Sequence, residues 1–367
     1  MNNTTNKIAL AIAALVGFSA TAQAAGGMAV AREGDKKLTM ETEAFINMGS
    51  WSQSDTPVTA TNAAHAQGLA VDRFYMTAKY KLDDVWSARF TADVNNEQAA
   101  SGSTMQRKMN VFVKYAYIEA AFNDAVQARL GISHTPWIDY EQKLWRHRYV
   151  SKVTSDHFKF DDSSDAGFGL KGSFGEGMVS YWATLTNGGG YGNPGSQTQG
   201  NNALDFNSRL TFSPIEGLDL SAQYRSGYRG SKVDLTNAAA APGTKEVLEQ
   251  VLLSYGTENF RLGANYLTRK ATPAVGSSAT DTTNALWGWA RFGDFGGFAK
   301  LESNKLKKQG NAVVEKRTHS VAGLEYFPRE DVTTSLAYDN EKFTDRGNVA
   351  RQTRKVTRVG LFTEFKL

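Results

Sequence analysis

The stretch Val85–Asn96, VWSARFTADVNN, decides the fold. Every second residue from position 86 to position 94 is apolar: Trp86, Ala88, Phe90, Ala92 and Val94. The residues between them are polar or charged. Successive side chains of a β-strand point to opposite faces, so this alternation predicts a strand with one apolar face and one polar face.

The same alternation recurs along the chain and predicts sixteen strands. They begin near Leu38, Leu69, Val85, Lys108, Ala125, Ala166, Met178, Ala203, Leu218, Glu246, Phe260, Asn284, Gly297, Arg317, Val332 and Gln352. Most span about 9 to 13 residues, a length that suits a tilted strand crossing a bilayer. The fourth, tenth and twelfth are ambiguous because both of their faces are partly apolar.

The connections between these strands alternate in length. Seven are short turns and eight are long polar loops, of which the longest is His134–Asp165. All seven prolines fall in or beside connections, in keeping with their exclusion from strand interiors. We therefore predict an all-β fold, a transmembrane antiparallel β-barrel of about sixteen strands with short turns at one end and long loops at the other.

The N-terminus carries an export signal. A positive charge at Lys7, the apolar run Ile8–Phe18 and the small residues Ala22 and Ala24 are typical of a secretory signal peptide; a short amphipathic helix is the alternative. We expect residues 1–24 to be removed, leaving residues 25–367 as a single barrel domain of 343 residues with a net charge of +3. The chain contains no cysteine, which excludes disulfides, thiolate metal sites and a lipoprotein anchor.

A membrane barrel explains the apolar faces better than a soluble sandwich does. Apolar faces on sixteen strands would build an oversized soluble core, whereas a closed barrel turns them all to lipid and leaves no free edge. Aromatic residues also lie at the strand ends nearest the short turns, as an interfacial girdle requires. They are Tyr80, Trp86, Phe122, Phe174, Phe212, Tyr255, Phe260, Phe292, Tyr326 and Phe365.

The polar faces predict what the barrel does. Sixteen strands enclose more space than side chains can fill, so an aqueous channel remains. With the ambiguous fourth strand left out, the inward-facing residues include fifteen bases and nine acids, a surplus of about +6 that favours anions. The pore-wall bases that we single out are Arg73, Arg89, Arg129, Arg209, Arg225, Arg261, Arg269, Arg354 and Arg358. The alternative is that these arginines only brace the wall against neighbouring acids.

Over its mature length the chain resembles the Gram-negative porins. The segments Val113–Glu119, Ala128–Gly131 and Thr135–Pro136 are similar to the phosphate-selective porin group. The resemblance implies passive diffusion of small hydrophilic solutes and ions with a preference for anions, a homotrimer, and an outer membrane with its lipid and lipopolysaccharide. The alternating end of the chain, up to Leu367, resembles the strand signal read by the barrel-assembly machinery, although that signal usually ends in phenylalanine.

The resemblance also gives the third loop a role, because in porins this loop folds into the lumen and narrows it. Residues 137–149, WIDYEQKLWRHRY, are too rich in aromatic and charged residues for a floppy external loop. Candidate constriction residues are Asp139, Glu141, Lys143, Arg146, Arg148 and Lys152. Charges of both signs across this narrowed part of the lumen, the neck, would select between solutes. A structured surface loop is the alternative.

Two other patterns in the sequence do not predict a binding site. Gly167–Gly172 matches G-x-G-x-x-G, but it lies in a predicted strand with no helix after it, so we expect no nucleotide site. The spacing of His134, His147 and His157 matches no metal motif. We expect no cofactor, no metal, no catalytic residue and no nucleic-acid partner. The rival functions are a barrel enzyme, a receptor and a barrel that sheathes a partner protein.

Overall fold

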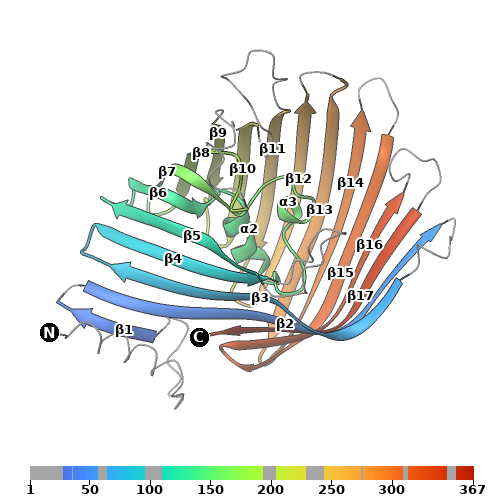
Figure 1. The fold of residues 1–367 in the computed structure, drawn as a ribbon, viewed down its shortest axis with the longest axis horizontal. Helices are drawn as coiled ribbons and strands as arrows, with labels where there is room; N and C mark the ends of the chain where they lie inside the picture. Colours follow the sequence, from blue (N-terminus) through green and yellow to red (C-terminus); the bar gives the residue numbers. More distant parts are fainter. Residues whose placement is uncertain are drawn as a thin grey trace.

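Sixteen antiparallel strands form a closed barrel, as predicted (Figure 1). The computed structural model describes residues 28–34, 36–56, 64–95, 110–192, 204–228, 244–273, 276–308, 313–344 and 353–367. The barrel strands are β2 (Lys36–Thr56), β3 (Ala64–Lys81), β4 (Trp86–Asn95), β5 (Asn110–Ala121), β6 (Gln127–His134), β7 (Ser164–Phe174), β8 (Val179–Thr186), β9 (Asp205–Phe212), β10 (Leu218–Gly227), β11 (Lys245–Gly256), β12 (Phe260–Thr272), β13 (Ala279–Phe292), β14 (Phe295–Lys308), β15 (Val313–Arg329), β16 (Val332–Thr344) and β17 (Thr353–Lys366).

The barrel closes between its last and first strands. β17 pairs with β2 from Thr353 opposite Thr56 to Lys366 opposite Glu43. A further strand, β1 (Met28–Glu33), pairs with β2 over residues 36–40, beyond the end of β17. This short seventeenth strand lies outside the ring and was not predicted. The predicted signal peptide lies outside the described residues.

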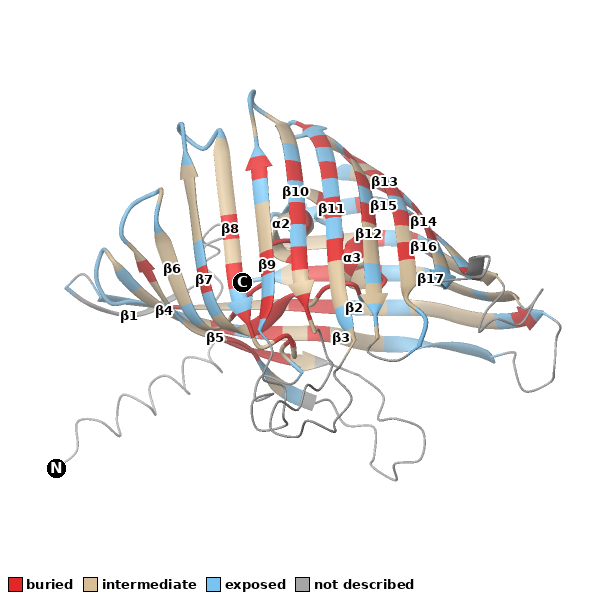
Figure 2. Ribbon diagram, turned by 90° about the horizontal axis from the view of Figure 1, so that it is seen from above, coloured by how far each residue is buried: buried red, intermediate tan, exposed pale blue. Residues whose placement is uncertain are grey.

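The side chains that the barrel exposes show which face of each strand points outward. Large apolar residues on the outward face are exposed, among them Leu69, Leu286 and Leu324 at 62–71%. Eight of the ten predicted girdle aromatics are exposed, and the other two, Phe260 and Phe365, are partly buried. Figure 2 shows exposed and buried residues alternating along β10 and β11. The described part of the chain contains no helix that is long and apolar enough to cross a membrane.

Two of the three ambiguous strands, β11 and β13, have definite faces in the structure. On β13, Trp287 and Trp289 point inward and are buried, while Leu286 points outward. On β11, Leu248 and Leu252 are buried inside. Both strands look apolar on two faces because the inner wall also carries apolar residues there, and these contact the segment between β6 and β7.

Some strand limits differ from the prediction. Observed barrel strands run from 8 to 21 residues, because several continue past the stretch of clear alternation. Pro328 was expected in a short turn but lies near the end of β15, where the register with β16 shifts between Tyr326 and Arg329. A register irregularity at that point accommodates a residue that cannot donate to the ladder. Gly167–Gly172 lies within β7, as predicted.

Candidate functional site

The segment between β6 and β7, residues 135–163, packs against the inner wall of the barrel. It contains α2 (Ile138–Trp145) and α3 (Thr154–His157), which lie within the ring of strands in Figure 1. Trp145 is fully buried, with its ring centroid 5.8 Å from those of both Trp287 and Phe298. The remaining apolar contacts of this cluster come from Trp137, Ile138, Tyr149, Val150 and Val153 in the segment and from Phe45, Tyr75, Leu252, Trp289, Val321, Ala337 and Phe362 in the wall.

Polar bonds tie the same segment to widely separated strands. The Tyr140 hydroxyl lies 2.7 Å from the Ser221 hydroxyl on β10. Farther round the wall, Lys300 on β14 donates to the Lys152 carbonyl (2.5 Å), and the Tyr149 hydroxyl donates to Glu325 on β15 (2.8 Å). These bonds, together with the apolar cluster, fix the segment against the wall from β10 to β16.

Glu141 serves as one of these anchors. Its carboxylate is buried and accepts hydrogen bonds from Trp137 Nε1 and Asn265 Nδ2, each at 2.7 Å. Burial raises the pKa of Glu141 to about 7. The structure therefore places Glu141 between α2 and the wall, where it faces protein groups on both sides.

The other charged residues in and next to α2 are Asp139, Lys143 and Arg146. Lys143 is largely exposed and pairs with Asp139 one turn earlier, at 2.8 Å. Burial acts to raise the pKa of the Asp139 carboxyl, but His134 and Lys143 outweigh it and hold that pKa below its usual range. Arg146 ends the helix in the left-handed conformation (φ 63°) with its guanidinium 4.4 Å from the centre of the Trp289 ring.

Beyond α2, the segment borders a cavity of about 320 Å³. Its lining residues are Phe45, Asp72, Arg73, Arg148, Tyr149, Val150, Ser151, Lys152, His157 and Arg358. Four bases thus surround the cavity against one acid, Asp72. Of the six predicted constriction residues, Arg148 and Lys152 line this cavity, whereas Asp139, Glu141, Lys143 and Arg146 do not. The expected opposition of Asp139 and Glu141 to the bases is therefore not the arrangement found at the cavity.

Arg148 differs from the other bases around the cavity. Among the described residues, no carboxylate lies within ion-pair distance of its guanidinium, whereas Arg73, Lys152 and Arg358 pair with Asp93, Asp156 and Asp339. Arg148 donates to the Tyr75 hydroxyl (2.5 Å) and lies over the Phe45 and Tyr75 rings. Its positive charge therefore borders the cavity with no carboxylate of the described residues in direct contact, and Asp156 and Glu43 act on it only from beyond ion-pair distance.

Most of the predicted pore-wall arginines form ion pairs with acids. This agrees with the alternative interpretation, in which the arginines brace the wall. Seven of the nine form ion pairs: Arg73–Asp93, Arg129–Glu119, Arg225–Asp205, Arg261–Asp219, Arg269–Asp281, Arg354–Asp55 and Arg358–Asp339. The other two lie over tyrosine rings, Arg89 at 4.8 Å from Tyr115 and Arg209 at 4.0 Å from Tyr140. The charge of the wall is thus largely balanced locally.

The predicted inner surplus of about +6 was counted without the fourth strand and without the ends of the longer strands. Four acids that pair with these arginines were missing from the count: Asp55, Glu119, Glu246 and Asp281. Asp55 and Asp281 lie in stretches predicted as loops, and Glu119 lies on the ambiguous fourth strand. Because β2 and β13 run further than the alternation suggested, these acids reach the wall.

Two β-bulges hid further lining residues. The pairing of β2 with β3 skips Asp72 between Phe45 and Ile46, and the pairing of β4 with β5 skips Lys114 between Thr91 and Ala92. A bulge adds one residue to a strand and breaks the period of two. Asp72 consequently lines the cavity together with Arg73, and Lys114 is buried together with Tyr115, which strict alternation forbids.

Comparisons with known proteins support the fold. No protein-family model and no curated protein sequence matches the chain. Solved structures do. The outer-membrane protein OmpT of Vibrio cholerae superposes with a TM-score of 0.63 at 9% identity, covering 92% of this chain and 99% of that one. An anion-selective porin from Comamonas acidovorans gives 0.60 at 13% identity, with coverages of 90% and 100%.

A third solved structure, the outer membrane channel DcaP of Acinetobacter baumannii, gives a TM-score of 0.59 at 10% identity and covers 94% of this chain and 100% of that one. At these identities the comparisons establish architecture. The chain has the sixteen-stranded barrel fold of the outer-membrane porins.

Proposed function

We propose that this protein forms a water-filled channel in the outer membrane of a Gram-negative bacterium, through which small hydrophilic solutes and ions diffuse passively with a preference for anions. The observation that carries the proposal is the cavity beside the segment between β6 and β7, which is the predicted third loop. It is lined by four bases and one acid, and Arg148 has no carboxylate partner among the described residues. Rings of arginine and lysine favour anions in pores.

The outward face supports a membrane location. Leucine, phenylalanine and tyrosine side chains are exposed on strands all round the barrel, which would be costly in water and is favourable in lipid. The export signal predicted in residues 1–24 fits delivery across the inner membrane. Outer-membrane lipid and lipopolysaccharide would then cover the outer surface, and the end of β17 would engage the assembly machinery.

The site residues divide into three proposed roles. Arg148 and Lys152 form the neck together with Arg73 and Arg358 on the opposite wall. Glu141 holds the segment in place. Asp139, Lys143 and Arg146, and the remaining wall bases Arg89, Arg129, Arg209, Arg225, Arg261, Arg269 and Arg354, set the field along the approach to the neck. Because seven of the nine wall arginines are paired, Arg73 and Arg358 among them, we assign the selectivity mainly to Arg148.

Assembly as a homotrimer and selectivity for phosphate are finer parts of the proposal. The trimer follows from the resemblance to porins. Phosphate is a candidate solute because the segments around Val113 and Ala128 resemble those of the phosphate-selective porins. Other oxyanions would suit four bases equally well.

Planar-bilayer recording tests this proposal. Purified protein should give stepwise, ohmic conductance, and the reversal potential in a KCl gradient should show a preference for chloride over potassium. Absence of conductance together with ester or peptide hydrolysis would instead establish a barrel enzyme. A cation-selective channel would remove the role given to the neck bases. Competing phosphate, sulfate and neutral sugars would then rank the solutes.

A further inference from the structure

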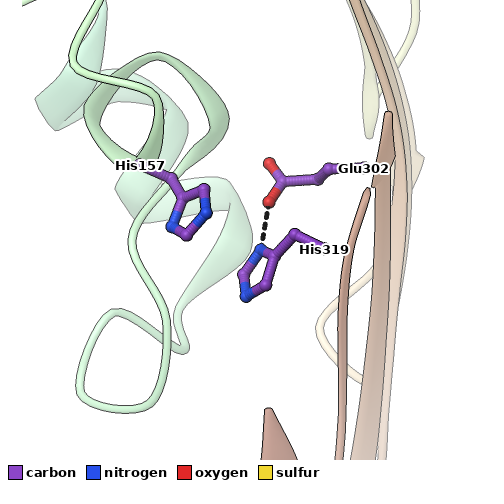
Figure 3. Close-up of side chains that lie close together, drawn as sticks. All are labelled: His157, Glu302 and His319. Atoms are coloured by element: carbon purple, nitrogen blue, oxygen red, sulfur yellow. Dashed lines mark hydrogen bonds and ion pairs between the residues drawn. The ribbon is translucent and has the colours of Figure 1, made fainter. Parts of the chain in front are cut away.

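Two histidines from different parts of the chain stack at the inner wall. His157 belongs to α3, and His319 projects from β15; their ring centroids are 4.0 Å apart and their planes differ by 5°. Figure 3 shows His157 approaching from the inter-strand segment while Glu302 and His319 project toward it from neighbouring strands. The stack thus joins α3 to the barrel wall.

The charge of His319 can be read from its partners. Its Nδ1 lies 2.5 Å from Glu302 Oε2, and its Nε2 lies 2.9 Å from Asp339 Oδ1. Carboxylate oxygens accept hydrogen bonds, so each ring nitrogen must carry a hydrogen to bond its partner. The two acids therefore hold His319 as a positively charged imidazolium, buried from solvent.

His157 is placed differently. Its Nε2 donates to Glu341 Oε1 at 3.2 Å. Burial lowers the pKa of His157, and the neighbouring His319 lowers it further. Near neutral pH its ring is therefore uncharged, which suits a stack on an imidazolium.

The charges that face the stack come from every element around it. They are Lys300 and Glu302 on β14, Arg317 and His319 on β15, Asp339 and Glu341 on β16, Arg358 on β17, Asp72 and Arg73 across the cavity, and Arg148, Lys152 and Asp156 in the segment itself. The three acids nearest the rings, Glu302, Asp339 and Glu341, are offset by Lys300, Arg358 and the His319 imidazolium. A proton on His157 would add a positive charge to this balanced set, and among the described acids only the Glu341 carboxylate, at 3.2 Å, is bonded to it directly.

The same residues do not form a metal site in this arrangement. Donor atoms of His157, Glu302 and His319 lie within 4.8 Å of one another. A metal ion lies in the plane of each imidazole that binds it, along the nitrogen lone pair. Two nearly parallel planes at stacking distance share no such position, and both nitrogens of His319 are already engaged.

We propose that the His157–His319 stack is a pH-dependent latch, which holds α3 against β14–β16 when His157 is neutral and releases it when His157 is protonated. Protonation would place two positive rings face to face at 4.0 Å. A histidine whose pKa is lower in the docked state favours docking above its ordinary pKa of 6.5. Docking therefore weakens as the pH falls below that value.

Release of the latch would reshape the neck. His157 and Lys152 line the same cavity as Arg148, so movement of α3 displaces two of the lining groups. This consequence for ion flow rests on the proposed channel function, whereas the latch itself does not.

Cysteine accessibility tests the latch without any channel recording, because the chain has no cysteine of its own. Ser155 is fully buried in α3, so Ser155→Cys should react slowly with a thiol reagent while the latch is closed. Gln67→Cys on an exposed part of β3 is the matched control, since its rate corrects for the titration of the thiol. Between about pH 7.5 and pH 5, the corrected rate at position 155 should rise about tenfold, which corresponds to a loss of about 1.4 kcal/mol of docking free energy.

Three further variants separate titration from a purely structural role. His157→Gln should abolish the pH dependence, and His65→Gln, which alters an exposed histidine on β3, should leave it intact. Glu341→Gln removes the acid that favours protonated His157 in the docked state, so release should occur at higher pH. An unchanged corrected rate on acidification, or the same rise in His157→Gln, would overturn the latch. A latch that opens by this assay in a protein without conductance would refute the proposed channel and leave the latch standing.

Discussion

The segment between β6 and β7, residues 135–163, has two sides with opposite character. Toward β10–β16 it is closely packed and hydrogen-bonded to the wall: Trp145 packs on Trp287 and Phe298, and Glu141 and Tyr149 bond to the wall. Toward β2, β3 and β17 it borders a cavity lined by four bases. We call these the anchored side and the charged side.

The difference assigns separate tasks to the two sides. On the anchored side each buried charge has a hydrogen-bonding partner, so little charge remains to act on a solute. On the charged side Arg148 lies against aromatic rings with no carboxylate beside it among the described residues. The anchored side fixes position, and the charged side sets selectivity.

The largest expected effect comes from breaking the anchored side with Trp145→Ala. Removing a fully buried tryptophan typically costs about 3 to 5 kcal/mol, which here falls on docking of the segment. The segment should detach, so single-channel conductance should rise and protease should cleave between β6 and β7.

Trp86→Ala is the matched control for that substitution. Trp86 carries the same ring but lies partly exposed on the outward face at a strand end. Its loss should leave conductance and cleavage unchanged. Equal conductance in Trp145→Ala and the unaltered protein would refute the anchoring role.

A smaller effect is expected from changing the charged side with Arg148→Gln. A unit charge at about 5 Å in water is worth about 0.8 kcal/mol, or about fourfold, with opposite sign for the two ions, so the preference for chloride over potassium should fall by up to about sixteenfold. Reversal potentials in a KCl gradient measure this change.

Two comparisons sharpen the Arg148 prediction. Arg354→Gln removes an equal charge from a bidentate pair with Asp55, with both bonds at 2.8 Å, and should shift selectivity less. Lys143→Glu combined with Arg146→Glu alters bases that do not line the cavity and should also shift it less per charge. A larger shift from either variant would move the selective site away from Arg148.

The smallest effect concerns pH at the anchored side. Because burial raises the pKa of Glu141 from 4.5 to about 7, docking of α2 is strongest below its ordinary pKa and weakens as the pH rises through 7. Glu141→Gln removes the titratable charge and keeps one oxygen, which can accept from Trp137 or from Asn265 but not from both. Protease cleavage of the segment should therefore increase from about pH 6 to pH 8 in the unaltered protein and stay constant in the variant; equal pH dependence in both would contradict this account.

The fold could be predicted because alternation reports directly which face each residue takes. All sixteen barrel strands are present, and even the fourth, tenth and twelfth, whose faces were ambiguous, are strands. The ambiguity had a physical cause: Leu252, Trp287 and Trp289 are apolar and yet point inward, because they contact the inter-strand segment.

The candidate site was less predictable because it depends on register and on distant pairs. The bulge at Asp72 breaks the period that assigned faces, so a lining acid was missed. The pairing of arginines with Asp55, Glu119 and Asp281 depends on strand neighbours that the pattern of a single strand does not reveal. The resemblance to porins predicted Arg148 and Lys152 as constriction residues. No sequence pattern near His319 predicts its partners, because they lie on neighbouring strands.

The central claim is that ions pass on the charged side of the segment, and single cysteines in this cysteine-free chain test it directly. Arg148→Cys should react with a charged methanethiosulfonate reagent in an open channel, and the current should fall in discrete steps. Leu252→Cys, buried on the anchored side, should not react under the same conditions. A current that is unaffected by modification at position 148, or one blocked from position 252 instead, would contradict the account.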